Sequence, residues 1–588
     1  MGEIEVPVLI VGGGGCGLAA SVFLSDHGVD HLLVERHPDT SIVPKAHYLN
    51  QRTMEIFRQH GLDEEIFEVG APLDKFGAIT WITSLAGDQP LDGRMVHTMD
   101  AFGGGALRER FAEAGPILPV KLPQIRLEPI LRRRAQERNP GRVLFSHELG
   151  DFTDHGDHVT AEVRNTVTGE VTTVKARYLV AADGGRTVGA KIGVEMQGIP
   201  KIATTTTAYF KADLSPWWVE GALIMHLLNP YRPELSNNLI EMGPSWGKAC
   251  EEWVLHFTPG AMAEYDEESL LAAIREALGL PGLELELLHA TRWTVEGVVA
   301  SHYRVGRVLI GGDAAHRQPP TVGLGLNSGI QDSHNLAWKL AMVLDGRASD
   351  SLLDTYESER RPVCQANVEW ALSAANHHQG ILDGLGLGHR IPPARRLPAF
   401  TTYFSDTPIG ETARARAVEV FESHRGGCQA HDMEIGFSYE DGAVVPDGSE
   451  PARRVPLRDI YTPSTRPGNV LAHAWIERDG QRLSTHDLTG HSTRFALITG
   501  PDGAAWREAA AQVAEKFSVP IVVAAIGAGA AYGDADGRWA GVRQIGDDGA
   551  ILVRPDNHVA WRSAGASESP VDALSSALAR VLDYSPAS

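Results

Sequence analysis

The strongest constraint on the fold is an N-terminal pattern of buried strand, glycine-rich turn, helix and second strand. Val8–Val11 is continuously apolar, as in a parallel strand covered on both faces, and a Gly-x-Gly-x-x-Gly turn follows it directly. The next strand, 31–34, ends in the acidic Glu35. This order predicts a Rossmann-like βαβ unit, in which the helix N-terminus attracts phosphates and the acid binds a ribose hydroxyl.

The residues of this unit have separate tasks. Gly12 permits the tight turn, Gly14 lets the backbone approach a pyrophosphate, and Gly17 lets the helix pack closely on the strand. We therefore predict a dinucleotide site, against the alternative of a glycine-rich turn without a ligand. The residues expected to contact the dinucleotide here are Gly12, Gly14, Gly15, Gly17, Glu35 and Arg36.

A second strand–turn–helix unit lies over residues 306–340. The apolar run Val308–Ile310 ends in a Gly-Gly-Asp turn, and two prolines and a glycine-rich loop precede a helical pattern that begins at Asn327. Such a unit suits a polar or anionic cofactor, whose hydroxyl groups would donate hydrogen bonds to Asp313. A Gly-Asp pair by itself would indicate only an ordinary strand–loop–helix connection. The expected cofactor contacts are Asp313, Pro320, Gly323, Gly325, Leu326 and Asn327.

The full string of this unit, GDAAH…PP…G.G.N.G..D..NL.WKL, resembles the second flavin-binding motif of the class A FAD-dependent aromatic hydroxylases. The resemblance implies that FAD is the cofactor and that Asp313 holds its ribityl chain. It also implies that NADH or NADPH reduces the flavin, which then takes O₂ to a C4a-hydroperoxide that hydroxylates an electron-rich ring.

The segment 44–55, PKAHYLNQRTME, is similar to a motif of the phenol hydroxylase branch, which includes 2,4-dichlorophenol 6-monooxygenase and 2-hydroxybiphenyl 3-monooxygenase. The resemblance implies that His47 reaches the substrate hydroxyl and accepts or relays its proton, a task that suits a pKa near neutrality. Lys45 occupies the position of a family arginine near the flavin. It keeps the positive charge but lacks the planar guanidinium that forms bidentate hydrogen bonds. We assign His47, Lys45 and Pro320 to the catalytic centre; a loop histidine without a function is the alternative for His47.

Two further segments extend the resemblance. Gln124 begins a helix in a PQ…LE segment whose glutamine contacts the ribityl region, although a plain helix start is the competing interpretation. Asp183 and Gly184 follow a strand in the position of the DG motif, which is associated with FAD and nicotinamide binding. Lys191 lies where the family often has arginine, and no second Gly-x-Gly-x-x-Gly turn occurs in a βαβ setting. NADH or NADPH is therefore expected to dock without a Rossmann domain of its own.

Residues 186–295 contain several strand-forming runs and predict an antiparallel sheet that forms one wall of a substrate cavity. Four tryptophans would suit a planar aromatic substrate, with core packing as the alternative: Trp217, Trp218, Trp246 and Trp253. In the related branch an acid follows an ADLS-like segment, here Ala212–Ser215. The stretch that follows offers only Glu220 and His226, so His47 is expected to act alone.

The acidic composition narrows the set of partners. The 588 residues include 75 acidic and 53 basic ones, a formal net charge of −22, which argues against nucleic acid and anionic membranes. There is no secretory pattern and no apolar run long enough for a membrane span. The four cysteines form no CxxC pair, so neither a disulfide framework nor a metal site is expected. We expect a cytoplasmic homo-oligomer whose partners are an aromatic small molecule and O₂.

The predicted fold class is α/β, with a Rossmann-like FAD-binding domain, an antiparallel-sheet substrate domain as in para-hydroxybenzoate hydroxylase, and a thioredoxin-like C-terminal domain. The predicted boundaries are 1–185 and 296–380 for the FAD domain with inserted segments near 70–115, 186–295 for the substrate domain, 381–430 for a linker, and 431–588 for the C-terminal domain. The last assignment rests on the resemblance of segments such as 549–563, and without a CxxC pair that domain is expected to be structural.

The function expected from the resemblance is hydroxylation of a phenolic or hydroxypyridine-type ring, ortho to an existing hydroxyl, in catabolism or natural-product tailoring. Two alternatives stay open. One is another flavin oxidoreductase, an oxidase or a halogenase, although a WxWxIP motif is absent. The other is a non-catalytic flavin-binding homologue, which Lys45 and the missing acid after Ser215 favour.

Overall fold

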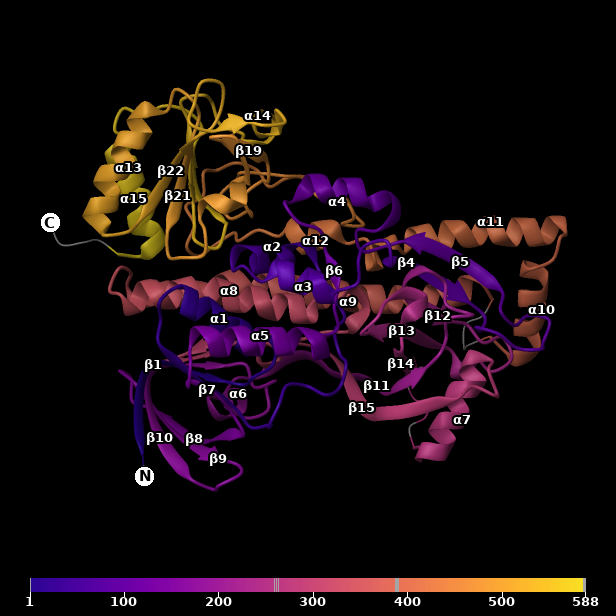
Figure 1. The fold of residues 1–588 in the computed structure, drawn as a ribbon. Helices are drawn as coiled ribbons and strands as arrows, with labels where there is room; N and C mark the ends of the chain where they lie inside the picture. Colours follow the sequence, from indigo (N-terminus) through magenta and orange to yellow (C-terminus); the bar gives the residue numbers. More distant parts are fainter. Residues whose placement is uncertain (1, 258–259, 261, 263, 387–390, 585–588) are drawn as a thin grey trace.

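Two large sheets lie side by side in the computed structural model, and a C-terminal domain packs on the helices beside the first sheet (Figure 1). The structure describes residues 2–257, 260, 262, 264–386 and 391–584. Across these described ranges, no helix combines the length and the apolar character that crossing a membrane requires.

The first sheet is the predicted Rossmann-like layer. Its parallel strands are, in spatial order, β7 (Val143–Phe145), β2 (His31–Glu35), β1 (Glu3–Val11), β10 (Val171–Ala181) and β17 (Val308–Ile310). The short β16 (Arg304–Val305) adds an antiparallel edge, and β8 (His147–Asp154) and β9 (Val159–Asn165) form a meander with β10. Val8, Leu9 and Ile10 are fully buried, because both faces of β1 are covered.

Helices surround this sheet and connect it to the rest of the chain. α1 (Gly15–Asp26) contacts both α5 (Gln124–Arg138) and α8 (Gly325–Leu344). The smaller elements nearby are β3 (Tyr48–Leu49), β6 (Val120–Lys121), α2 (Gln51–Gln59), α3 (Asp63–Val69), α4 (Arg108–Ala114) and α6 (Val188–Lys191). The β3–β6 pair joins the segment that contains His47 to the start of α5.

The second sheet contains eight strands, mostly antiparallel. Their spatial order is β18 (His316–Arg317), β15 (Leu285–Ala300), β11 (Met196–Ala212), β14 (Glu252–Phe257), β13 (Asn237–Gly243), β12 (Gly221–Leu227), β4 (Phe76–Ile82) and β5 (Met95–Asp100). Segments near 70–115 are predicted as insertions in the FAD domain, but β4 and β5 from this region extend the second sheet. Their pairing with β12 joins segments far apart in the chain, which short-range sequence patterns do not reveal.

The two faces of the second sheet have different neighbours. On one face, Trp253 and Leu255 of β14 pack with α7 (Glu267–Leu278). On the other face, Val254 of the same strand packs with Tyr209 and with Ile125 of α5. Because α5 belongs to the helices around the first sheet, this second face is the one turned toward the first sheet.

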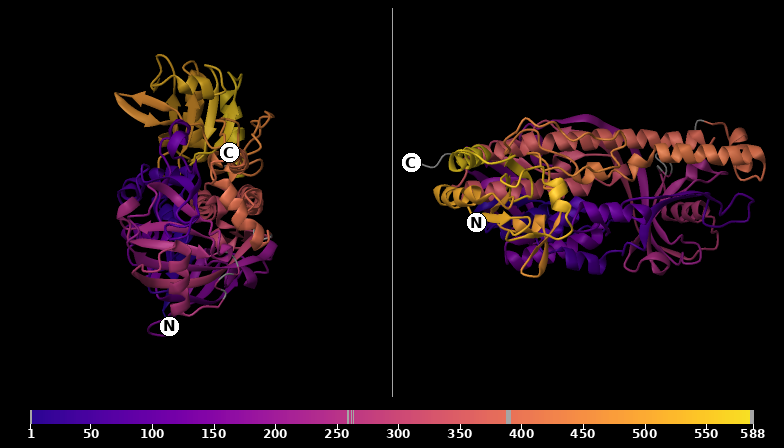
Figure 2. Two further views of the ribbon diagram at one scale, coloured as in Figure 1. Left: turned by 90° about the vertical axis from the view of Figure 1, so that its right-hand side faces the viewer. Right: turned by 90° about the horizontal axis from the view of Figure 1, so that it is seen from above.

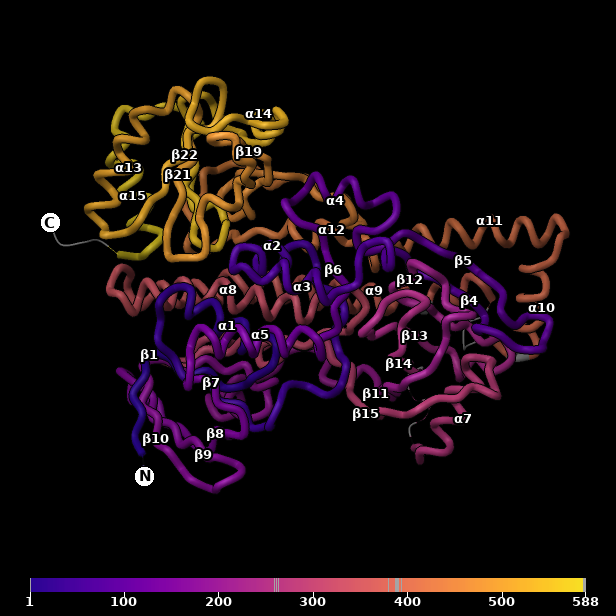
Figure 3. Tube along the Cα trace, in the orientation of Figure 1, coloured from indigo at the N-terminus to yellow at the C-terminus, as the bar shows by residue number. Residues whose placement is uncertain are grey.

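The long helix α9 (Asp354–Gly384) leads from the first sheet to the second, as Figure 3 traces. Over 381–430, where a linker is predicted, the structure has the end of α9 and two further helices, α10 (Pro393–Tyr403) and α11 (Pro408–Ser423). Phe400 and Phe421 from these helices are buried in one cluster with Trp81. Of the three prolines that indicated a linker, Pro392 is the N-cap of α10 and Pro393 lies in its first turn, where proline is tolerated, whereas Pro398 lies inside the helix.

The C-terminal domain has a four-stranded sheet in the order β22 (Ile521–Ala525), β21 (Phe495–Thr499), β24 (Ala550–Val553) and β25 (Val559–Ser563). Its other elements are α12 (His431–Ile435), β19 (Trp475–Arg478), β20 (Gln481–Ser484), α13 (Ala504–Phe517), β23 (Gly533–Asp534), α14 (Arg538–Val542) and α15 (Pro570–Leu582). Figure 2 shows this domain on one side of the molecule in both views. Phe495 contacts Trp338 of α8, so the domain packs directly on the flavin-motif helix.

Candidate functional site

The glycine turn after β1 has the geometry that its sequence predicts. Gly12 has a φ of +110°, and a Cβ there would lie 2.3 Å from the carbonyl oxygen of Ala182. A Cβ on Gly17 would lie 1.9 Å from the carbonyl oxygen of Gly12. Both positions therefore require glycine, one for the turn and one for the close packing of α1 on the strand.

Glu35 lies beside this turn at the end of β2. Its two carboxylate oxygens accept hydrogen bonds from the main-chain N–H groups of Gly13 at 2.6 Å and His37 at 2.8 Å. Each oxygen retains a lone pair that a ribose hydroxyl could use. Arg36 next to it donates to His37 and lies at the edge of the same turn.

Glu128 also reaches the start of α1, although the sequence analysis did not select it. Its buried carboxylate accepts hydrogen bonds from Gly15 N at 3.0 Å, Ser41 N at 2.9 Å and Gln124 Nε2 at 2.5 Å. Gln124 N in turn donates to the carbonyl oxygen of Ala46 at 2.8 Å. Glu128 thus fixes Gln124 and the segment before His47 against the glycine turn. Its place in the PQ…LE segment is the signal that could have found it.

The second predicted motif brings Asp313 to the same region. Its exposed carboxylate has no hydrogen-bond or ion-pair partner among the described residues. Burial, then Asp332 and more weakly Asp313, raise the pKa of the Cys16 thiol in the first turn of α1 to about 12. Leu326 approaches from α8, since a Cβ on Gly15 would lie 2.7 Å from it. The N-termini of α1 and α8 therefore converge beside Asp313.

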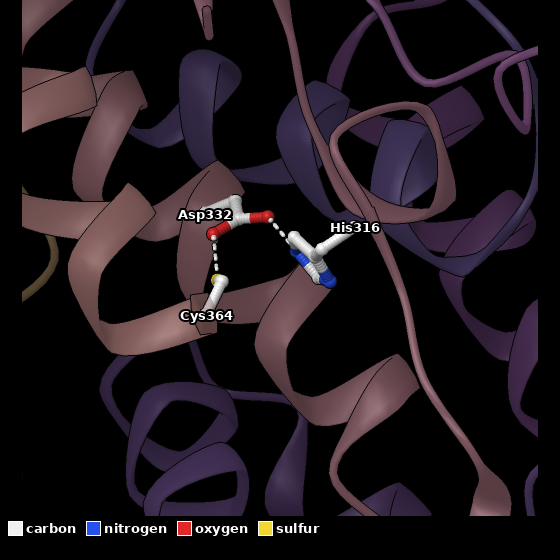
Figure 4. Close-up of side chains that lie close together, drawn as sticks. All are labelled: His316, Asp332 and Cys364. Atoms are coloured by element: carbon white, nitrogen blue, oxygen red, sulfur yellow. Dashed lines mark hydrogen bonds and ion pairs between the residues drawn. The ribbon is translucent and has the colours of Figure 1, made fainter. Parts of the chain in front are cut away.

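A buried charged pair supports the turn that carries Asp313 (Figure 4). His316 Nε2 donates to Asp332 Oδ2 at 2.7 Å, and Gly312 N donates to the same oxygen at 3.1 Å. Arg360 donates to the other oxygen at 2.8 Å. Although burial works the other way, His316 and Arg360 lower the pKa of Asp332 to about 2.

Cys364 lies beside this pair, and its thiol is 3.9 Å from Asp332. His316, Asp332 and Cys364 are close enough together to hold a metal ion. Arg360 already neutralises the carboxylate, and a cation here would meet its guanidinium at short range. We therefore interpret this cluster as support for the Gly312 turn.

Asn327 is a structural link between the two motif loops. Its side chain donates to the carbonyl oxygens of Tyr48 at 3.0 Å and Gly323 at 2.6 Å, and it accepts from Asn50 N at 3.0 Å. Gly323 has a φ of +69° and lies against the Tyr48 ring. The segment of His47 is thus fixed to the glycine loop that precedes α8.

The remaining predicted cofactor residues lie around this centre. Asp183 uses its carboxylate within its own turn, accepting from Gly185, Thr187 and Val188 N–H groups, while Gly184 has an open φ of +73°. Lys45 and Pro320 are exposed, and Gly325 has open space at the N-terminus of α8. Lys191 forms an ion pair with Asp151.

These groups fit a flavin dinucleotide. The main-chain N–H groups of Gly14, Cys16 and Gly17 have no hydrogen-bond acceptor within the described part of the chain. Donors of this kind at a helix N-terminus bind phosphates. With the free lone pairs of Glu35 and the unpartnered carboxylate of Asp313, they form the donor and acceptor set that a diphosphate flanked by hydroxyl groups requires.

His47 lies near the second sheet, within electrostatic reach of His256 in β14. Its Nδ1 is buried without a hydrogen-bond partner. Burial, then the charges of Lys121 and His256, lower the pKa of His47 to about 3. The expectation of a pKa near neutrality is therefore wrong, because the imidazole lies in a desolvated place beside a cation. His47 is neutral at physiological pH.

Lys121 of β6 and its partner Glu241 of β13 are fully buried. Lys121 Nζ donates to Glu241 Oε1 at 2.8 Å, and Glu241 Oε2 accepts from Gly247 N at 2.8 Å. Burial lowers the pKa of Lys121, against the effect of Glu241. The positive charge of Lys121 lowers the pKa of His47, so its ammonium lies within electrostatic reach of that ring.

A row of side chains crosses the second sheet on the face turned toward the FAD-binding layer. We name it the polar row; its members are paired directly across neighbouring strands and are His226, Asn238, His256 and Thr207. Thr207 Oγ1 lies 2.7 Å from His256 Nδ1 and accepts from Trp293 at 2.9 Å. The sequence analysis missed His256, which only strand pairing brings near His47.

The other candidates for the substrate wall lie elsewhere. Trp218 and Trp253 pack against each other on the α7 side of the sheet, where Trp217 also lies, so core packing accounts for them. Trp246 donates to Val69 O and lies 5.8 Å from Lys121 Nζ. Glu220 is paired with Lys75 at the surface.

An open hollow of about 580 Å³ between Lys211–Ser215, Lys248–Glu251 and Glu284–Glu286 lies further along β11, away from the motifs.

Comparison with known proteins identifies matches over almost the entire chain. The FAD binding domain family matches residues 5–371, and the family of aromatic-ring hydroxylase C-terminal domains matches residues 464–585. 2,4-Dichlorophenol 6-monooxygenase of Cupriavidus pinatubonensis is 35% identical over 98% of this chain and 96% of its own length. Tetracenomycin A2 monooxygenase-dioxygenase of Streptomyces glaucescens is 35% identical over 99% of this chain and 98% of its own.

A solved structure is similar along its whole length. The crystal structure of the flavin-dependent monooxygenase PieE in complex with FAD and substrate superposes with a TM-score of 0.92. It is 38% identical in sequence, and the match covers 99% of this chain and 100% of that one. The flavin motifs, the second sheet and the C-terminal domain thus occur together in one solved fold.

Proposed function

Since this chain belongs to the family of FAD-binding aromatic-ring hydroxylases and is an FAD-dependent monooxygenase, we propose that it hydroxylates a phenol or hydroxypyridine ortho to the ring hydroxyl. The observation that carries the proposal is the position of His47. It is neutral, has an unpartnered ring nitrogen, and lies between the flavin-motif loops and the polar row. A ring bound there would have its hydroxyl at His47.

FAD would be held by the groups that converge at the ends of β1 and β17. We assign the adenosine ribose to Glu35, the diphosphate to the N–H groups of Gly14, Cys16 and Gly17, and the ribityl chain to Asp313. When bound, and reduced by NADH or NADPH, FAD supplies the O₂ chemistry that adds one oxygen atom to the ring. Lys45, Gln124 and Pro320 are assigned to its edge.

The chain's own contribution is to orient the ring and to favour its ionised form. A neutral His47 accepts a hydrogen bond from the substrate hydroxyl at Nε2, the ring nitrogen that stays accessible in this partly buried side chain. The ammonium of Lys121 stabilises negative charge nearby, so the same field that lowers the pKa of His47 also lowers that of the bound phenol. The phenolic proton passes to solvent, because a His47 with a pKa of about 3 does not hold it, and the phenolate that remains is the better nucleophile.

One experiment separates this proposal from an oxidase and from a non-catalytic homologue. The purified protein with bound FAD is mixed with NADH or NADPH, with and without phenol or 3-hydroxypyridine, and the products are analysed by mass spectrometry. We expect nicotinamide oxidation to accelerate with the aromatic compound and a product heavier by one oxygen atom. Oxidation that yields only hydrogen peroxide would indicate an oxidase, and no oxidation at all would indicate a flavin-binding homologue.

A further inference from the structure

The polar row is longer than a single phenol ring requires. His256 lies near His47, and the row continues through Asn238 to His226, two strands away. Adjacent strands are separated by about 4.8 Å, so His226 lies roughly 10 Å along the sheet from His256. A single-ring substrate whose hydroxyl binds at His47 would leave that end of the row without a ligand.

The far end of the row is formed by three polar side chains from different elements. His226 Nδ1 lies 2.5 Å from Asn238 Oδ1, and the His226 ring is 4.7 Å from the ring of His378 in α9. Trp81 stacks on His226 at 5.1 Å with an interplanar angle of 15°. The His226 ring is therefore held in place by a hydrogen bond and by stacking.

The hydrogen-bonding capacity of this group is only partly used. Burial, then His378, lower the pKa of His226 well below its ordinary value, and burial, then His424, lower that of His378 to about 4. Both rings are neutral. Since Asn238 Oδ1 only accepts, His226 Nδ1 carries the proton and Nε2 is left with a free lone pair. Within the described residues, neither His226 Nε2, Asn238 Nδ2 nor either His378 nitrogen has a hydrogen-bond partner.

We infer that His226, Asn238 and His378 form a second polar subsite, which binds a hydroxyl or carbonyl group at the far end of an extended aromatic substrate. The inference rests on the proposed function, because it places the reacting ring at His47. Neutral imidazoles and an amide recognise neutral oxygen groups, and the free nitrogens of this group keep accessible surface at which such an oxygen can bind. The substrate is therefore larger than one ring and carries oxygen at both ends.

The test compares two ligands that differ only at the far end. 4-Hydroxybiphenyl has one hydroxyl, and 4,4′-dihydroxybiphenyl has a second one at about the distance of two strand spacings. Each is titrated into the FAD-loaded protein, and the dissociation constant is measured from the change in flavin absorbance. We expect the dihydroxy compound to bind about five- to tenfold more tightly, the effect of one neutral hydrogen bond.

Three variants locate the effect. In His226→Phe and His378→Phe the ratio of the two dissociation constants should fall to about one. His97→Phe is the matched control, because His97 is paired with Trp81 in line with the row, but Trp81 separates it from His226. There the ratio should stay as in the parent protein. Flavin content and circular dichroism show that each variant is folded.

The inference is wrong if the parent protein does not distinguish the two ligands, if neither ligand binds, or if the advantage survives both His226→Phe and His378→Phe. Failure of the proposed function would give a different experimental result. In that case the ligands would still bind with different affinities, but neither would accelerate NADH or NADPH oxidation.

Discussion

The hydroxyl of Tyr48 donates to the carboxyl group of Glu434 at 3.1 Å, which joins the residue after His47 to a short helix near the start of the C-terminal part of the chain. Gly323 of the flavin-motif loop lies against the same tyrosine ring. No cation is paired with Glu434 in the part of the chain that the structure describes. Burial raises the pKa of Glu434 to about 8, against the effect of Tyr48.

This relationship predicts how stability depends on pH. An unfolded glutamate ionises near pH 4.3, whereas folded Glu434 stays protonated up to about pH 8, so this group favours unfolding by up to about 1.4 kcal/mol for each pH unit in between. Glu434→Gln removes the effect. Relative to the parent, we expect the variant's melting temperature to rise between pH 5 and 8 and to stay level above that. Glu369→Gln, at an exposed position of α9, is the control. A difference that is constant with pH would contradict the prediction.

Asp313→Ala should weaken FAD binding. The carboxylate is exposed and unpartnered beside the N-termini of α1 and α8, and charge-assisted hydrogen bonds contribute roughly 1.5–3 kcal/mol each. We expect the dissociation constant of FAD to rise by about 10- to 150-fold while the fold is retained. The exposed Asp213→Ala variant, which changes a turn in the second sheet, should bind FAD as the parent does. If Asp313→Ala purifies with full flavin and unchanged affinity, Asp313 does not hold the cofactor.

His47→Ala should slow hydroxylation by about 2- to 12-fold, the effect of losing one neutral hydrogen bond to the substrate hydroxyl. Raising the pH toward the pKa of the substrate should restore much of the rate, because the substrate then ionises unaided. FAD content should stay normal. His302→Ala, at a side chain that is 62% exposed, is the matched control. Single-turnover oxidation of the reduced enzyme with substrate and O₂ gives these rates.

The parent enzyme should show no titration of His47 between pH 6 and 8. Burial and the neighbouring Lys121 and His256 keep its pKa near 3, so its neutral form is present throughout that range. Between pH 6 and 8, the pH profile of kcat should therefore show the same transitions in the parent enzyme and in His47→Ala. A transition near pH 6.5 that this variant removes would show that substrate and flavin restore an ordinary pKa to His47.

Glu359→Gln should weaken the packing of the C-terminal domain on the flavin-motif helices. Both oxygens of Glu359 bind Arg554, at 2.7 and 2.9 Å, and one also binds Lys339 at 2.7 Å, with all three side chains fully buried. Removing one partner of a buried ion pair costs about 3–5 kcal/mol. We expect a lower melting temperature and faster proteolysis between the domains. Glu369→Gln on the same helix should change neither.

The sequence by itself determined the parts of this protein that depend on residues close together in the chain. The strand before Gly12, the steric need for glycine at Gly12 and Gly17, and the acid at the end of β2 are local properties, and the structure has each of them. The family followed from strings of this kind, and the comparisons confirm it.

Tertiary structure decided the chemistry around His47. Its low pKa comes first from burial and then from Lys121 and His256, and all three act only after the two sheets pack together. Strand pairing placed His256, Asn238 and His226 in one row, and it added β4 and β5 to the second sheet, although they are distant in the chain. Such pairings depend on register between separate segments, which no local pattern specifies. The desolvation that keeps these histidines neutral exists only in the folded chain.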